Sequence, residues 1–329
     1  MDLPSPLLEV QNLTTHFHTS EGVVRAVDAV SLSVRAGETV GLVGESGSGK
    51  SITARSIMRL VASPPGRIVG GRIGFKGQNL MALDDAAMQR IRGVEISMIF
   101  QDPMTFLNPI MTVGRQVAEV IRAHRGLNRG PLRAEVIKAL REARVPSPER
   151  IVDFYPHQLS GGMRQRVLIA IAMACSPSLL IADEPTTALD VTIQAQILQI
   201  LKAIVREQNT ALLLITHDLG VIADVCDRVY VMYAGQIVED GDTTELFEHP
   251  RHPYTRGLLR SVAPANRKVD TFPGIEGHMP NLLDPPSGCR FHPRCEHAMP
   301  ICRERDPATV RQASEGAPAC WLYEKEEAA

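Results

Sequence analysis

Aromatic residues, unbalanced charge and long apolar runs are all scarce in this chain of 329 residues, and each scarcity excludes a class of protein. Phe, Trp and Tyr together make up 4% of the sequence, which is too little for a surface that stacks nucleic-acid bases. Lys and Arg (35) nearly match Asp and Glu (37), and the formal net charge of -2 gives no electrostatic reason to expect a nucleic-acid partner.

No run of residues is apolar for long enough to predict a membrane span. The longest candidate, 167–182, is interrupted by Ser176, Pro177 and Ser178, and it falls short of about 18 uninterrupted apolar residues. The first residues lack the basic and apolar segments of a secretory signal. We therefore expect a cytosolic protein that reaches a membrane only through another subunit.

Short apolar segments alternate with segments of helical spacing, which predicts an α/β fold with a largely parallel sheet. The expected strands lie at 38–43, 98–100, 179–182, 212–216 and 229–233. The expected helices lie at 51–60, 167–175 and 192–207. Residues 233–238 have the composition of a turn between two strands, which indicates an antiparallel edge.

Three regions differ from this alternating core. Residues 7–34 alternate in the manner of strands, whereas 109–150 have helical spacing and no convincing strand. The second region predicts a helical insertion, about 102–175, within a first domain at 1–250. Beyond it the density of Pro and Gly rises, which predicts a small, loop-rich extension at 251–329.

The run Gly44-Glu45-Ser46-Gly47-Ser48-Gly49-Lys50-Ser51 lies between an apolar strand and a helix, which is the context of a phosphate-binding loop. Its glycines allow backbone N–H groups to curve around phosphate oxygens, and the helix N-terminus adds partial positive charge. Lys50 would neutralise β and γ oxygens, and the Ser51 hydroxyl would bind Mg²⁺. The alternative, a loose Gly/Ser turn with an exposed lysine, is disfavoured by the ordered strand, loop and helix.

Asp183 and Glu184 end a second apolar strand, and ligands of such sheets bind beyond the carboxyl ends of the strands. Asp183 could orient Mg²⁺, either directly or through a water. Glu184 could accept a proton from an attacking water, a role that typically contributes ~10²–10⁴-fold to a rate. Alone, this pair would more simply cap the next helix, but the phosphate loop favours the catalytic interpretation.

Ser160, Gly161 and Gly162 form a second potential anion site, far along the chain from the phosphate loop. Ser160 is a favourable N-cap, and the two glycines leave backbone N–H groups open at a helix start. Two such sites on one chain indicate a nucleotide held between two protomers. The segment 159–163 resembles the signature motif of the ATP-binding cassette (ABC) superfamily, with Met163 where the family usually has Gln.

Further motifs in the family's order extend the resemblance over roughly residues 7–241. Gln101 resembles the glutamine that contacts Mg²⁺ and the attacking water, and Ala188-Leu189-Asp190 resembles the loop whose aspartate acts across the dimer. His217 resembles the histidine that contacts the γ-phosphate. Phe17 resembles the aromatic residue on which adenine stacks, and only spacing favours it over its two histidine neighbours.

This resemblance implies a P-loop NTPase (RecA-like) cassette that carries an antiparallel β subdomain and an inserted α-helical subdomain. It implies an ATPase in which Glu184 activates water while ATP and Mg²⁺ lie between one protomer's phosphate loop and its partner's signature loop. ATP would then act through its differential affinity for the closed dimer.

A closer resemblance rests on segments 104–109, 155–158 and 252–255 and on the Pro- and Cys-bearing tail. These are similar to the oligopeptide/dipeptide import family, and most similar to its dipeptide-type D subunits, although Phe106 stands where Ser is more usual. The family implies a paired F-type ATPase, two membrane permease subunits, an extracytoplasmic peptide-binding protein and a place at the cytoplasmic face of the membrane.

Two other functions remain open at this point. Import of nickel or another small solute is the nearest alternative, because other subunits select the substrate. A soluble ABC ATPase of DNA repair or translation is disfavoured, since such proteins generally have two cassettes or long coiled-coil insertions. A scaffold that binds nucleotide without hydrolysing it conflicts with the presence of Glu184 and His217 together.

Four of the six cysteines lie near the end of the chain: Cys289, Cys295, Cys302 and Cys320. Four thiolates can hold an iron–sulfur cluster or a structural Zn²⁺, and the spacing lacks the paired two-residue gap usual for zinc ribbons. The family resemblance implies a [4Fe–4S] cluster, with Zn²⁺ and free thiols as alternatives. Cys175 and Cys226 have apolar helical surroundings and are expected to be buried small hydrophobes.

Overall fold

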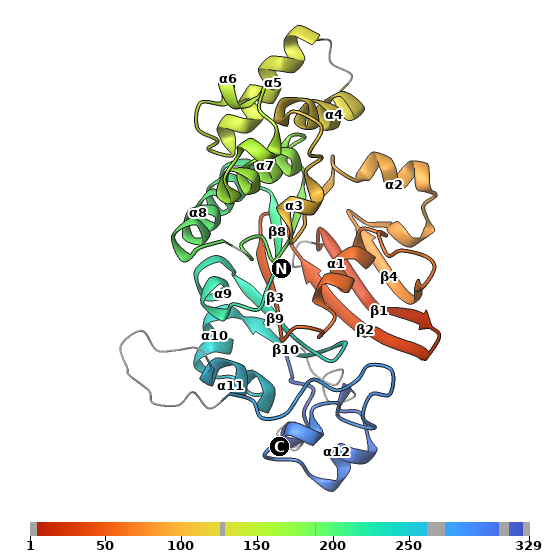
Figure 1. The fold of residues 1–329 in the computed structure, drawn as a ribbon. Coiled ribbons are helices and arrows are strands. Elements are labelled where there is room, and N and C mark those ends of the chain that lie inside the picture. The colour runs from red at the N-terminus through yellow and green to blue at the C-terminus, as the bar shows by residue number, and fades with distance from the viewer. Residues whose placement is uncertain (1–4, 126–128, 188, 262–273, 309–315, 325–329) are drawn as a thin grey trace. The chain divides into compact units, whose positions relative to one another are not determined.

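The computed structural model describes residues 5–125, 129–187, 189–261, 274–308 and 316–324 (Figure 1). The chain forms two compact units, each assembled from segments that are distant in sequence. Unit 1 is built mainly from Val34–Thr39 and Leu80–Leu214. Unit 2 is built from Leu7–Ser33, Val40–Asn79 and the residues from Ile215 onward. Among the described residues, no helix is both long and apolar enough to cross a bilayer.

Unit 2 contains a four-stranded sheet in the order β2-β1-β4-β5. Its strands are β1 (Leu8–Thr19), β2 (Gly22–Val34), β4 (Gly66–Phe75) and β5 (Gln78–Asn79). Strand β4 pairs antiparallel with both β1 and β5. Buried apolar residues recur along β1 and β2, as expected of a sheet that is covered on one face. The strands expected over 7–34 and the antiparallel subdomain are thereby confirmed.

A second group of strands in unit 2 carries the phosphate loop. It consists of β3 (Thr39–Val43), β9 (Arg228–Tyr233) and β10 (Gln236–Asp242). Strand β3 is parallel to β9, whereas β9 and β10 are antiparallel. Ala234 and Gly235 join β9 to β10 with positive φ angles of 46° and 87°, as in a tight hairpin turn. The antiparallel edge predicted at 233–238 is therefore confirmed.

The helices of unit 2 are short. They are α1 (Lys50–Ile57), α9 (Leu219–Val225), α10 (Thr243–Glu248) and α11 (Pro253–Arg260). Beyond α11 the described residues form only the 3₁₀ turns η3 (His292–Arg294) and η4 (Trp321–Tyr323) and the helix α12 (Pro300–Glu304). This agrees with the loop-rich character predicted for the end of the chain.

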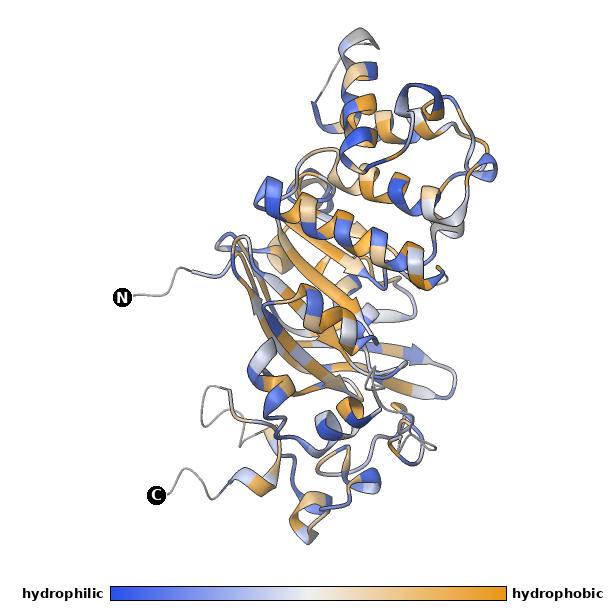
Figure 2. Ribbon diagram, turned by 90° about the vertical axis from the view of Figure 1, so that its left-hand side faces the viewer, coloured by the Kyte–Doolittle hydropathy of each residue, from blue (hydrophilic) through white to orange (hydrophobic). Residues whose placement is uncertain are grey.

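Unit 1 contains the strands β6 (Ile96–Ile99) and β7 (Leu179–Asp183) and most of β8 (Ala211–Thr216). Strands β6 and β7 are parallel, with Ile96 opposite Leu179. Both β7 and β8 are buried along their whole length. Figure 2 shows these inner strands as continuously hydrophobic, whereas the helices carry both colours. Continuous apolar strands are typical of a parallel sheet that is covered on both faces.

Helices fill the chain between β6 and β7. They are α3 (Pro103–Phe106), α4 (Val113–Arg125), α5 (Arg129–Glu142), α6 (Pro148–Ile151), the 3₁₀ turn η2 (Pro156–Gln158) and α7 (Gly161–Met173). The described part of 109–150 contains no strand, which confirms the predicted helical insertion. The remaining elements of unit 1 are η1 (Leu80–Ala82), α2 (Asp85–Ile91) and the long helix α8 (Val191–Gln208).

Candidate functional site

The phosphate loop leaves β3 after Val43 and ends where α1 begins at Lys50. Gly44, Gly47 and Gly49 have φ angles of 155°, 81° and 107°, a region that residues with a side chain rarely occupy. A Cβ at Gly44 would lie 2.1 Å from the Met232 carbonyl oxygen, closer than any packed contact. The conformation of this loop therefore requires its glycines, as the sequence predicted.

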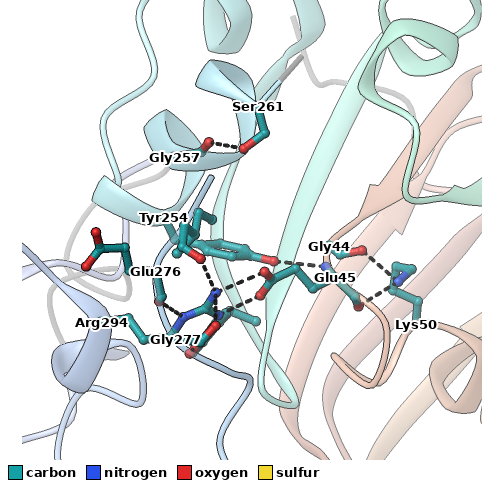
Figure 3. Close-up of polar contacts among 11 residues, drawn as sticks. Gly44, Glu45, Lys50, Tyr254, Gly257, Ser261, Glu276, Gly277 and Arg294 are labelled. Carbon is teal, nitrogen blue, oxygen red and sulfur yellow. Dashed lines mark hydrogen bonds and ion pairs between the residues drawn. The ribbon is translucent and has the colours of Figure 1, made fainter. Parts of the chain in front are cut away.

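Lys50 is buried and turns back onto its own loop (Figure 3). Its Nζ donates hydrogen bonds to the carbonyl oxygens of Gly44 at 2.8 Å and Glu45 at 3.0 Å. The ammonium group thus lies inside the curve of the loop, where phosphate oxygens are expected. Ser51, the expected Mg²⁺ ligand, occupies the next position in the first turn of α1.

Phe17 lies in β1 opposite Gly66 and is half-buried. Because side chains alternate along a strand, Phe17 shares a face with Thr15, whose hydroxyl forms a 2.8 Å hydrogen bond with Ser56 of α1. The face of β1 that bears Phe17 is therefore the one that contacts the helix following the phosphate loop. His16 and His18 lie on the opposite face. The adenine-stacking role of Phe17 stays a prediction.

In unit 1 the two predicted carboxylates follow one another at the end of β7. Asp183 is the last residue of the strand and is buried, whereas Glu184 is half-buried with a φ of 45°. A residue with a side chain in this conformation is uncommon, and such strain concentrates at functional sites.

The Glu184 carboxylate accepts hydrogen bonds from Thr187 and Gln101. Thr187 Oγ1 donates to Glu184 Oε2 at 2.8 Å, and Gln101 Nε2 donates to the same oxygen at 3.1 Å. Gln101 follows β6, which is the parallel neighbour of β7, so both residues extend from the carboxyl ends of adjacent strands. The structure therefore brings Gln101 and Glu184 together, while the contribution of Thr187 was not foreseen from the sequence.

The predicted signature segment begins α7. Ser160 is its N-cap, and its Oγ accepts a hydrogen bond from the Met163 N–H at 3.4 Å. Gly162 packs against α8 so closely that an added Cβ would lie 2.6 Å from Ile193 Cγ2. Helix α8 is capped by Asp190, whose Oδ1 accepts a hydrogen bond from the Ile193 N–H at 2.9 Å.

The signature segment therefore packs against the start of α8, the helix that Asp190 caps. From the sequence these were predicted as two separate motifs. Gly161 takes part in the same contact, because an added Cβ would lie 3.5 Å from Leu189 Cδ2. Ala188, which belongs to the predicted loop, lies outside the described residues. His217 follows the end of β8 and is exposed.

The four tail cysteines line one small cavity together with Phe291, His252 and Trp321. Burial raises the pKa of the Cys289 thiol to about 12 and that of Cys320 to about 11, and it also raises the pKa of Cys295. Among the described residues, no group of three or more His, Cys, Asp or Glu side chains is arranged to hold a metal ion, so the predicted iron–sulfur or zinc site gains no support from this geometry. Cys175 and Cys226 are buried, as predicted.

Two residues at the phosphate loop were missed by sequence reasoning. Arg294 pairs with the Glu45 carboxylate, and the Tyr254 hydroxyl accepts a hydrogen bond from the Glu45 backbone N–H (Figure 3). Both belong to segments whose resemblance to a family was noted, the 252–255 motif and the cysteine tail. Their spacing in the sequence gave no signal that they reach the loop.

Comparison with family models gives two matches. Residues 27–187 match the model described as ABC transporter, and residues 238–302 match the model described as oligopeptide/dipeptide transporter, C-terminal region. The chain also resembles a solved dimeric ATP-binding cassette in a post-hydrolysis state with ADP and Pi. That likeness has a TM-score of 0.64 at 30% identity and covers 72% of this chain and 98% of the other.

Several curated proteins are similar over nearly the whole length. A probable peptide ABC transporter ATP-binding protein of Sinorhizobium fredii is 50% identical, over 96% of this chain and 94% of the relative. An oligopeptide transport ATP-binding protein of Bacillus subtilis is 49% identical over 98% of both chains. A dipeptide transport ATP-binding protein of Escherichia coli is 48% identical over 92% of both.

Proposed function

The chain belongs to the ABC transporter family, among the ATP-binding proteins of peptide transporters, and on this premise we propose that it hydrolyses ATP to power the import of dipeptides or oligopeptides. The observation that carries the peptide assignment is the match at residues 238–302, because this region lies beyond the cassette match and its model is described as the C-terminal region of oligopeptide/dipeptide transporters. The chain is thus an ATPase coupled to transport.

In the proposed mechanism, ATP binds along the phosphate loop with Lys50 on its β and γ oxygens. Ser51, Gln101 and Asp183 would hold Mg²⁺, whose charge would offset that of the phosphates when bound. Glu184 accepts a proton from the attacking water, and His217 donates a hydrogen bond to the γ-phosphate. The orientation of Glu184 by Gln101 and Thr187 supports its role as the base.

The second half of the proposed nucleotide site comes from a partner. Ser160, Gly161 and Gly162 of one protomer would contact the phosphates bound by the other, with Asp190 acting across the same interface. The N-cap geometry of Ser160 supports this role, because it leaves the first N–H groups of α7 open to an anion. Phe17 would stack on the adenine.

We propose that the partner cassette is a related F-type ATPase, and that the pair works at the cytoplasmic face of a membrane. There the pair would move two permease subunits that receive peptide from an extracytoplasmic binding protein. Purification of the full complex through a tag on this chain tests the assembly. Recovery of the chain with identical copies of itself and no second ATPase would contradict the proposed heterodimer.

We further propose that Cys289, Cys295, Cys302 and Cys320 hold a [4Fe–4S] cluster. Their shared cavity supports a common ligand, and the absence of the paired two-residue spacing of zinc ribbons favours the cluster over Zn²⁺. When bound, the cluster would cross-link a segment that is too small for a core of its own. Anaerobic purification, an absorbance spectrum and metal analysis test this: zinc alone, or four free thiols, would contradict it.

Uptake measurements in a strain that lacks this chain test the proposed substrate. Restoring the chain should restore uptake of a labelled dipeptide or tripeptide, and the Glu184→Gln variant should not. Labelled nickel serves as the competing substrate in the same strain. Restoration of nickel uptake without peptide uptake would overturn the peptide assignment while leaving the ATPase assignment intact.

A further inference from the structure

Glu45 is a carboxylate within a loop that binds anions. It is the second residue of the phosphate loop, and its backbone carbonyl already accepts a hydrogen bond from Lys50. A triphosphate in the loop would bring several negative charges close to this side chain, and like charges at short range repel. A carboxylate at this position is therefore compatible with tight nucleotide binding only if a cation compensates it or draws it aside.

Arg294, in the C-terminal extension, supplies that cation (Figure 3). Its two terminal nitrogens lie 2.7 and 3.0 Å from the two Glu45 carboxylate oxygens, which is a bidentate pair. The side chain of Arg294 is 5% exposed and that of Glu45 is 31% exposed. Solvent therefore screens this pair less than an ion pair on the surface.

The guanidinium of Arg294 is fixed in place independently of Glu45. Its Nε donates to the Glu276 carbonyl at 2.8 Å, and a terminal nitrogen donates to the Ile275 carbonyl at 3.2 Å. The group also lies over the Tyr233 ring, 5.8 Å from its centroid. These contacts come from the extension and from β9, so Arg294 is held in place by more than its pair with Glu45.

Tyr254 fixes the backbone of the same loop residue. Its hydroxyl accepts a hydrogen bond from the Glu45 N–H at 2.9 Å. The Tyr254 ring is fully buried and packs edge-on against Tyr233 at 4.6 Å, with Phe291 at 5.4 Å. This aromatic cluster, from β9, α11 and the tail, holds the Tyr254 hydroxyl firmly at the start of the phosphate loop.

We propose that Arg294 and Tyr254 are positioning residues for the phosphate loop: Arg294 neutralises Glu45 and draws its carboxylate aside, and Tyr254 fixes the adjoining backbone, so that the loop is open to triphosphate. The C-terminal extension thereby takes part in nucleotide affinity. The inference rests on ATP binding at this loop, which the unaltered chain tests on its own.

The experiment measures the Kd of MgATP for the full-length chain and its variants. Arg294→Ala should raise the Kd by about tenfold, within the range expected for loss of a charge-assisted hydrogen-bonded partner. Glu45→Gln should change it little, and Arg294→Ala combined with Glu45→Gln should return it close to that of Glu45→Gln alone. Arg294→Lys, which keeps the charge without the bidentate geometry, should lie in between.

The control is Arg260→Ala. Arg260 also belongs to the C-terminal part of the chain and pairs with a carboxylate, Glu296 at 3.4 Å, but the pair is exposed and its contact is outside the loop. Its loss should leave the Kd unchanged. A merely structural role of Arg294 predicts a lower melting temperature with an unchanged Kd, and no rescue by Glu45→Gln.

Either of those structural outcomes would overturn the proposal. Should Arg294→Ala fail to fold, Arg294→Lys and Tyr254→Phe carry the test. Tyr254→Phe should raise the Kd severalfold. Wild-type affinity in both Arg294→Lys and Tyr254→Phe would also contradict the proposal. Failure of the unaltered chain to bind MgATP would instead contradict the proposed function, so the two failures are distinguishable.

Discussion

The phosphate loop in unit 2 and the Glu184 region in unit 1 are held in place by different kinds of contact. Glu45 is held by a buried arginine 249 residues away in sequence and by a tyrosine 209 residues away. Glu184 is held by a threonine three residues away and by one exposed hydrogen bond from Gln101. The loop is therefore positioned by long-range tertiary contacts, whereas one hydrogen bond to the Glu184 carboxylate is local in sequence and the other is exposed.

This difference matches the tasks proposed for the two regions. Nucleotide binding gains from a loop whose shape exists before the ligand arrives, because less ordering is needed on binding. Hydrolysis that depends on a partner protomer gains from a base whose orientation can change when the two cassettes close. We therefore expect changes in unit 2 to alter affinity and changes near Glu184 to alter turnover.

The largest expected effect comes from Glu184→Gln. Loss of the proton acceptor should lower the ATPase rate by ~10²–10⁴-fold while the Kd of MgATP stays near that of the unaltered chain. Steady-state hydrolysis and equilibrium binding on the assembled transporter measure the two quantities. Glu119→Gln, at an exposed position on α4, is the control and should hydrolyse normally. Near-normal turnover in Glu184→Gln would remove the distinction between the two regions.

The next largest effect is expected at Lys50. Lys50→Ala removes charge-assisted hydrogen bonds to the phosphates, and the Kd of MgATP should rise by roughly tenfold to a hundredfold. Binding is measured in the presence of excess Mg²⁺, with Lys138→Ala, an exposed lysine on α5, as the control. A lower turnover at saturating ATP with an unchanged Kd would contradict this prediction, because it would mean that the phosphate loop in unit 2 does not determine the affinity for MgATP.

The smallest effect is expected at Gly162, within unit 1. Gly162→Ala places a Cβ where Ile193 Cγ2 lies 2.6 Å away, and overpacking of this kind typically lowers stability by about 1–3 kcal/mol. Thermal unfolding should show a lower melting temperature for this variant. Adding Ile193→Ala, which removes the clashing atom, should recover part of the loss. If Gly162→Ala lowered the melting temperature equally in the wild-type and Ile193→Ala backgrounds, the close approach of α7 and α8 would not be the cause.

Local motifs were predictable from the sequence because the residues that form each motif are close together in the chain. The loop between β3 and α1, the end of β7 at Asp183 and the N-cap of α7 at Ser160 each need only adjacent residues, and the structure has each at the predicted position. The contact between Gly162 and Ile193, and that between Glu45 and Arg294, join residues far apart in the chain. Spacing carries no information on such pairs, since only the folded strands and helices bring them together.

The position of Lys50 has a consequence for how the loop receives its ligand. With its ammonium on the carbonyls of Gly44 and Glu45, this lysine has already exchanged much of its hydration shell for backbone oxygens. An arriving phosphate would replace those two acceptors instead of stripping water from a fully hydrated cation. Much of the lysine's desolvation therefore takes place during folding, and nucleotide capture becomes largely a change of hydrogen-bond acceptors within a loop that is already formed.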